Sequence, residues 1–353
     1  MALIEEKIEA LLKGRVTPKK GQVTYTPYNG TSPRLSAKLV ARKAPEVMAK
    51  ITGFSKNSKG MKSHFEYISR TSDPNKADVE IENGLGEIFS GKAQIESAYS
   101  EWESDIKHYE KEHGRGKPTR EVMNLVLSMP AGTEPEKVKE AVRRFARHTF
   151  SENYEYVFAL HTDDDHPHVH LDVKMRGYNA VKLNPRKADL QNWREGFAQE
   201  LRAVGVAASA TNRRARGVTK KSVNSVVKQI NTGDKSRQPR VAKTTALQTK
   251  EAVDEIITES KGEESKSNRP WKKSLEKNLK DVKSQYAEVI NLLMATNKKE
   301  DLQLAGELKS FLSGVPNKVV TQSDDLKRKV LEDIAGTKPV KQAEKIKDIS
   351  PSR

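Results

Sequence analysis

The chain has 353 residues with 64 Lys or Arg against 48 Asp or Glu, which gives a formal net charge of +16 and a pI near 9.6. Its length predicts about two domains, and this excess of cations favours an anionic partner, most often nucleic acid. The lack of cysteine excludes a disulfide framework and argues against a structural zinc site. No apolar run reaches the roughly 18 residues of a transmembrane helix, and the N-terminus is charged where a signal peptide would be apolar. We therefore expect a cytoplasmic protein with no membrane insertion.

The first 46 residues predict a basic N-terminal lead that opens with a short helix. Gly14 ends this helix, and five apolar residues share one of its faces, namely Leu3, Ile4, Ile8, Leu11 and Leu12. Residues 15–45 are rich in Lys, Pro, Ser, Gly and Thr, so we expect them to be irregular.

Residues 47–217 carry strand and helix patterns in alternation. We expect strands over 47–54, 122–129, 156–161 and 168–175, and helices over 61–71, around 95–109, after a capping box at Thr133–Glu136, and from about Leu190 to Gly205. This order predicts an α+β fold in which an antiparallel sheet is sandwiched with helices. We expect the helices to lie on one face of the sheet and the hairpin site, described next, to be open to solvent.

Four of the eight histidines lie between His161 and His170, within a predicted β-hairpin. On the second strand His168 and His170 share one face, because side chains alternate along a strand, and the turn brings His161 to them. Three converging imidazoles with open coordination positions predict a divalent metal site for Mg²⁺ or Mn²⁺, with Zn²⁺ as an alternative. His166 has the wrong parity for this face, and we expect it to contact solvent, with DNA as the alternative. A solvated hairpin tip without a metal is the competing interpretation.

A tyrosine on the predicted helix over 61–71 is the candidate nucleophile. Met61, Phe65 and Ile68 bury one face of that helix, which leaves Tyr67 on another face with Arg70 nearby. A tyrosine on a helix serves packing more often than catalysis, so this pattern alone leaves both roles open.

Beyond residue 217 the composition changes. Between Thr211 and Thr245 we count ten basic residues against one acid, Asp234, so we expect a flexible basic linker over 218–270. Residues 271–340 predict a helical C-terminal region, whose first helix carries a heptad seam of Leu275, Leu279, Val282, Tyr286, Val289 and Leu293. Packing of these helices on each other and dimerisation both remain open, and residues 341–353 predict a disordered tail.

Two segments carry a family resemblance: Ala49–Arg70, which reads AKITGFSKNSKGMKSHFEYISR, and His161–Lys174, which reads HTDDDHPHVHLDVK. With the stretches Val126–Thr133 and Ala210–Gly217, they resemble relaxases of the MobA and T-DNA border endonuclease type, the DNA-nicking enzymes of plasmid mobilisation among the histidine-hydrophobic-histidine endonucleases. The resemblance covers residues 47–217, which would be the relaxase nuclease domain, and it reaches neither the lead nor the tail.

The resemblance implies a transesterification on single-stranded DNA at a plasmid transfer origin. Tyr67 would attack one phosphodiester and form a 5′-phosphotyrosyl link, while His161, His168 and His170 would hold the metal and Asp163 would orient one of these imidazoles. The basic residues that we assign to DNA contact are Lys56, Lys59, Arg70, Lys174, Arg213, Arg214 and Arg216.

The order of the motifs separates two relatives of this superfamily. Relaxases place the tyrosine before the histidine motif and rolling-circle replication initiators place it after, so Tyr67 favours a relaxase. Two alternatives stay open: a replication initiator, and a non-catalytic, metal-stabilised module that binds single-stranded DNA with Tyr67 stacked on a base. Because the family's tyrosine normally lies closer to the N-terminus, Tyr25 and Tyr28 are rival nucleophiles. The expected partners are auxiliary mobilisation proteins and a type IV coupling and secretion machinery, with translocation of the protein alongside the DNA.

Overall fold

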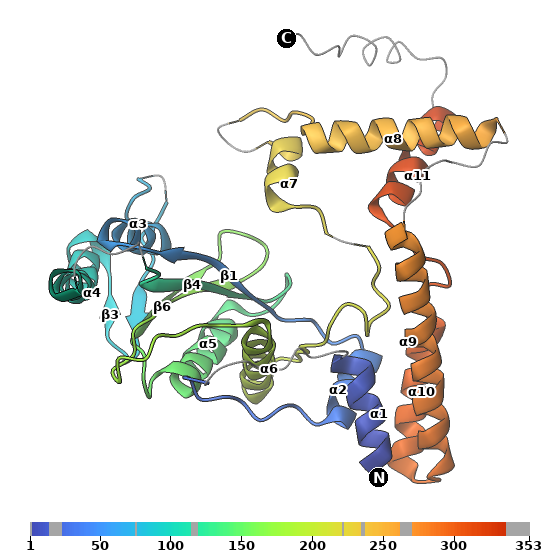
Figure 1. Cartoon of the computed structure of the whole chain (residues 1–353), viewed down its shortest axis with the longest axis horizontal. Helices are drawn as coiled ribbons and strands as arrows, with labels where there is room; N and C mark the ends of the chain where they lie inside the picture. The colour runs from blue at the N-terminus through green and yellow to red at the C-terminus, as the bar shows by residue number, and fades with distance from the viewer. Residues whose placement is uncertain are drawn as a thin grey trace. The chain divides into compact units, whose positions relative to one another are not determined.

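The computed structural model describes residues 2–13, 23–74, 76–113, 119–220, 222–233, 237–261 and 270–336. The chain divides into two compact units, one of residues 1–216 and 286–313 and the other of residues 217–285 and 314–353 (Figure 1). The predicted disordered tail over 341–353 lies outside the described residues, as do residues 14–22 of the lead and Lys221 and Lys235 of the predicted linker.

The first unit is built on a six-stranded antiparallel sheet with the strand order β1-β4-β6-β5-β2-β3. The strands are β1 (Met48–Ser55), β2 (Ile81–Asn83), β3 (Ile88–Phe89), β4 (Val122–Ser128), β5 (Tyr156–His161) and β6 (His168–Lys174). The four longer strands confirm the predicted ones to within a residue or so, and the antiparallel α+β fold is as predicted. Strands β2 and β3 were not predicted, because strands of three and two residues are too short to show an alternating pattern.

Helices cover both faces of this sheet, whereas the sequence predicted helices on one face only. Helices α5 (Pro135–Phe150) and α6 (Lys187–Ala203) lie on one side, with α3 (Ser58–Ile68) and α4 (Gly91–His113) on the other (Figure 1). Val169, Leu171 and Val173 of β6 point into the core on the α5 and α6 side. A second core, around Phe65 and Trp102, packs α3 and α4 against the other face. The candidate site therefore lies beneath a helix layer rather than on a bare sheet.

The N-terminal lead is helical where we expected irregular chain. Helix α1 (Ala2–Lys13) is as predicted, but Pro33–Ala41 forms a further helix, α2. Ser32 caps it, since its hydroxyl accepts a hydrogen bond from the Leu35 amide, and Pro33 occupies the first turn, where a missing N–H costs nothing. Helix α10 (Lys299–Ser313) contacts α2 through ion pairs of Arg34 with Asp301 and of Arg42 with Glu307.

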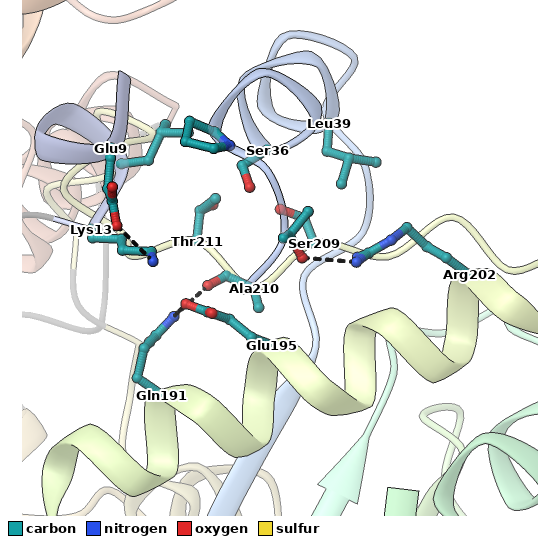
Figure 2. Close-up of a pocket in the computed structure, with 13 residues that line it drawn as sticks. Glu9, Lys13, Ser36, Leu39, Gln191, Glu195, Arg202, Ser209, Ala210 and Thr211 are labelled. Carbon is teal, nitrogen blue, oxygen red and sulfur yellow. Dashed lines mark hydrogen bonds and ion pairs between the residues drawn. The ribbon is translucent and has the colours of Figure 1, made fainter. Parts of the chain in front are cut away.

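A small polar cavity marks the junction of α1 and α2 with α6 (Figure 2). Lys13 is paired there with Glu9, and Gln191 of α6 donates to Glu195 and to the Ala210 carbonyl. The N-terminal helices are thus part of the same unit as the sheet.

Two helix starts differ from the prediction. Helix α3 begins at Ser58 rather than at residue 61, because the Asn57 side chain accepts from the Gly60 amide at 2.8 Å and caps it. The predicted capping box at Thr133 is wrong: its hydroxyl donates to the Pro130 carbonyl instead, and α5 begins after Glu134 without a side-chain cap. Gly205 ends α6 as predicted, in the left-handed region at φ 83°.

The second unit contains α7 (Ser225–Thr232), α8 (Lys243–Ser260) and α11 (Gln322–Gly336), and α9 (Pro270–Ala295) is divided between the units. Residues 218–270, which we expected to be a flexible linker, therefore hold two helices, whereas the C-terminal region is helical over α9, α10 and α11, as predicted. Lys327 of α11 is ion-paired with Glu255 and Glu259 of α8. None of the described helices is both long and apolar enough to cross a membrane.

Candidate active site

Three imidazoles converge at one end of the β5–β6 hairpin. His161 closes β5 and is paired with His168, which opens β6, and His170 follows on the same face. One ring nitrogen from each residue lies within 4.8 Å of the others. The alternation of β6 puts Val169 and Leu171 in the core on the opposite face, which is why the histidines gather on the α3 side.

The donor atoms of this cluster fit a divalent cation. Both ring nitrogens of His170 are buried and have no hydrogen-bond partner in the described part of the chain. Nδ1 of His168 donates to the His166 carbonyl at 3.0 Å, which leaves its Nε2 lone pair for a ligand. Burial lowers the pKa of His170 to about 3 and that of His161 to about 4, so both rings are neutral at pH 7. Neutral imidazole is the form that binds a metal.

Tyr67 lies beside this cluster on α3. Met61, Phe65 and Ile68 bury the inner face of the helix, and Tyr67 is 46% exposed. Its ring centroid lies 5.4 Å from that of His170. A phenol that is open to solvent and next to three imidazoles can meet a phosphate held there.

The rival tyrosines lie elsewhere. Tyr25 and Tyr28 are buried in the core on the α5 and α6 side of the sheet. Their hydroxyls donate to Asp189 at 2.7 Å and to Glu200 at 3.0 Å, and burial raises both pKa values. Neither hydroxyl is near the histidine cluster, and both have a structural partner.

A histidine–aspartate pair that was not predicted from the sequence lies next to Tyr67. His64 lies one helical turn before Tyr67, and the two ring centroids are 5.8 Å apart. Its Nδ1 donates at 2.7 Å to Oδ2 of Asp172, a fully buried carboxyl whose pKa is raised by burial. Two signals were present: Asp172 has the same strand parity as His168 and His170, and His64 has helical spacing to Tyr67.

Asp163 does not touch an imidazole directly. Its Oδ2 accepts from Nη2 of Arg70 at 2.8 Å and from Nζ of Lys76 at 2.6 Å. The same Nη2 of Arg70 also lies 2.8 Å from Nδ1 of His161. Burial would raise the pKa of Asp163, but the hydrogen bond from Lys76 and the charge of Arg70 outweigh it and hold that pKa below its usual value. Asp163 therefore reaches His161 through Arg70.

The basic residues that we assigned to DNA contact have different surroundings. Lys56 and Lys59 are exposed at the start of α3, on the side of the sheet that carries the histidines. Lys174 is buried, and its ammonium is ion-paired with Asp105 and Glu155.

The remaining members of that set follow α6. Arg216 is ion-paired with Glu46 at 3.2 Å, Arg214 is half-buried and Arg213 is exposed. His166 is exposed as expected, and its Nδ1 accepts from the Ala131 amide at 2.9 Å, which ties the hairpin turn to the loop after β4.

Comparison with known proteins finds one family that part of this chain resembles. The family model described as "Relaxase: MobA/VirD2-like, nuclease domain" matches residues 67–205. The T-DNA border endonuclease VirD2 of Rhizobium radiobacter is 26% identical over 174 residues, which are 46% of this chain and 40% of that protein. The VirD2 protein of Agrobacterium fabrum is 26% identical over the same length, 46% of this chain and 38% of its own.

The chain thus spans about two fifths of the length of these curated relatives. No solved structure matches it. The matched segment begins at Tyr67 and includes all three clustered histidines. Residues 67–205 of this chain are therefore similar to the nuclease domain of MobA/VirD2-like relaxases.

Proposed function

We propose that the protein is a relaxase that nicks one DNA strand by tyrosine transesterification. The observation that carries this proposal is the position of Tyr67, exposed on α3 with its ring 5.4 Å from that of His170. The relatives support it, since the matched VirD2 proteins are named T-DNA border endonucleases.

In the proposed reaction the Tyr67 oxygen forms a bond to phosphorus while the bond from phosphorus to the 3′ oxygen breaks. The phenol loses one proton and the released 3′ oxygen gains one, so the reaction conserves protons and leaves a 5′-phosphotyrosyl ester. Because the ester keeps the energy of the phosphodiester, the reverse attack by a 3′-hydroxyl rejoins the strand without ATP.

His161, His168 and His170 would hold the divalent cation. When bound, such a cation polarises the non-bridging oxygens and offsets the charge that develops on the phosphate. The neutral state of His161 and His170 at pH 7 and the buried, unpartnered nitrogens of His170 support this assignment. Three imidazoles suit Zn²⁺, and oxygen ligands from water and the phosphate at the open positions would complete the mixed set that Mg²⁺ or Mn²⁺ needs.

A free tyrosine titrates near pH 10, so its attack at neutral pH needs a proton acceptor. We assign this role to His64. Because Nδ1 of His64 donates to Asp172, Nε2 of His64 carries the lone pair that can accept a proton. The other two rings beside Tyr67 are those of His161 and His170, and the cation needs both of them as ligands. The buried Asp172 carboxylate would fix the tautomer of His64 in the same way as the aspartate of a Ser-His-Asp triad.

The substrate that we propose is single-stranded DNA at a transfer origin, with auxiliary mobilisation proteins and a type IV coupling and secretion machinery as partners. Lys56 and Lys59 would contact its phosphates, and their exposure at the start of α3 supports this assignment. In this proposal the protein acts in the bacterial cytoplasm and then crosses to a recipient cell with the DNA.

The test is incubation of the full chain with a labelled single-stranded oligonucleotide that spans a transfer origin and with Mg²⁺ or Mn²⁺. We expect a covalent protein–DNA band on a denaturing gel and a DNA-modified peptide that contains Tyr67. Metal-dependent DNA binding without any adduct would overturn the proposal and leave the non-catalytic binding module.

A further inference from the structure

The hydrogen bonds of His161 determine which of its ring nitrogens can bind a cation. Its Nε2 lies 2.7 Å from the Ile68 carbonyl oxygen, and its Nδ1 lies 2.8 Å from Nη2 of Arg70. A carbonyl only accepts and a guanidinium only donates, so Nε2 carries the hydrogen and Nδ1 carries the lone pair. Only Nδ1 of His161 can therefore coordinate a metal in this ring orientation.

Arg70 already binds that lone pair. In contrast, Nδ1 of His168 donates to the His166 carbonyl, so its Nε2 lone pair stays available, and both nitrogens of His170 have no partner in the described residues. Of the three imidazoles, His161 is thus the one whose coordinating nitrogen is engaged by a protein cation.

The surroundings of Arg70 hold its guanidinium at this position. Asp163 accepts from the same Nη2 at 2.8 Å, and the guanidinium carbon lies 5.2 Å from the Tyr67 ring centroid. The side chain is only 11% exposed. Arg70 follows the last turn of α3 in the left-handed region, at φ 62°, a conformation that costs a non-glycine residue about 1 kcal/mol. This turn directs the side chain back to the histidine cluster.

We propose that the Arg70 guanidinium and the divalent cation compete for Nδ1 of His161, so that metal binding releases Arg70 from the imidazole. The released guanidinium stays beside Tyr67 through Asp163 and becomes available to the scissile phosphate, for which a planar, permanently charged donor is well suited. Arg70 then couples metal binding to DNA binding. This second half rests on the proposed function, whereas the competition itself does not.

Lys76 provides a matched control. Its ammonium donates to the same oxygen of Asp163, at 2.6 Å, but it makes no contact with His161 that the structure records. Arg70→Ala and Lys76→Ala each remove one positive charge near the cluster, and only the first removes the competitor. The two variants therefore separate competition for a lone pair from general charge repulsion.

The experiment is a calorimetric titration of Mn²⁺ into the full chain in the absence of DNA. We expect Arg70→Ala to bind Mn²⁺ about tenfold more tightly than the parent chain does. A tenfold change in affinity corresponds to about 1.4 kcal/mol, which is close to the contribution of one hydrogen bond from a charged donor. Lys76→Ala should bind within about twofold of the parent. Equal tightening in both variants, or no tightening in Arg70→Ala, overturns the proposal.

A second measurement covers the case in which Arg70→Ala loses its fold. Nitrogen NMR of the parent chain should show His161 protonated at Nε2, with Arg70 side-chain signals that change when diamagnetic Zn²⁺ is added. Arg70 signals that do not respond while the histidine signals shift would also overturn the competition. Both measurements are made without DNA, so they stand even if the protein does not nick.

Discussion

The ring of Tyr67 meets that of His170 edge to face, with the centroids 5.4 Å apart and the planes at 85°. The two residues are far apart in sequence and lie on α3 and β6, and α3 packs on the face of the sheet that carries His170. This contact brings the candidate nucleophile to the candidate metal ligands, and the first two predictions test its two sides.

Tyr67→Phe should abolish the covalent adduct and leave DNA affinity within about twofold, because only the phenolic oxygen is lost. The measurements are adduct formation on a denaturing gel and oligonucleotide binding by fluorescence anisotropy. Tyr28→Phe is the matched control, since that hydroxyl is buried on the other side of the sheet. An adduct that persists in Tyr67→Phe would assign the nucleophile to another residue.

His170→Ala should lose divalent metal binding and nicking together, because it removes one of the three clustered imidazoles. His166→Ala should keep both activities nearly unchanged, since His166 is exposed in the turn and only accepts from the Ala131 amide. Calorimetry gives the metal affinity and the gel assay gives the nicking rate. Equal losses in the two variants would refute the assignment of the strand faces.

His64→Ala should slow adduct formation by about 10²- to 10⁴-fold, the usual contribution of a general base, without weakening DNA binding. Asp172→Asn should slow the same step while His64 remains in place, because the amide no longer selects the required tautomer. The single-turnover rate should rise toward that of the parent chain at high pH, because hydroxide from solvent can then take the proton of the phenol in place of His64. A defect of equal size at every pH would assign a purely structural role to His64.

The free energy of unfolding should fall as the pH drops from about 6.5 to about 5 when no divalent cation is present. Unfolded histidines take up a proton near pH 6.5, whereas burial lowers the pKa of His161 to about 4 and that of His170 to about 3 in the fold. The unfolded state therefore binds more protons in this window, at a cost of about 1.4 kcal/mol per pH unit for each histidine. Urea unfolding at a series of pH values measures how steeply the free energy of unfolding changes with pH. The proteins compared are the parent chain, His170→Ala and the exposed-site control His108→Ala, and only His170→Ala should reduce this slope.

Truncation after Gly217 should leave a domain that still nicks single-stranded DNA but unfolds at a lower temperature than the full chain. Residues 286–313 belong to the same unit as the sheet: the Tyr286 hydroxyl donates to the Ala215 carbonyl, and Asp301 and Glu307 pair with α2. Removing these partners exposes packed surface although the site itself is complete. Thermal unfolding and the nicking assay test this, with a truncation after Ser313 as the control. An unfolding temperature that stays the same after truncation at Gly217 would contradict this prediction.

Periodicity in the sequence determined the long elements and the composition of the histidine cluster. The alternation of β6 is enough to put His168 and His170 on one face and Val169 and Leu171 on the other, because the side-chain period of a strand leaves no other choice. Helical spacing likewise determined that Tyr67 lies away from the buried face of α3. Such patterns are local, so a single chain segment contains all the information that they need.

Only the tertiary structure decided which segments meet. The sequence offered Tyr25 and Tyr28 as well as Tyr67, and packing against α6 removed the first two by burying them with carboxyl partners. The pairing of His64 with Asp172 and that of Arg70 with His161 join residues about a hundred positions apart. No periodicity encodes such contacts, because they depend on how α3 packs across the sheet and on the left-handed turn at Arg70 that follows it.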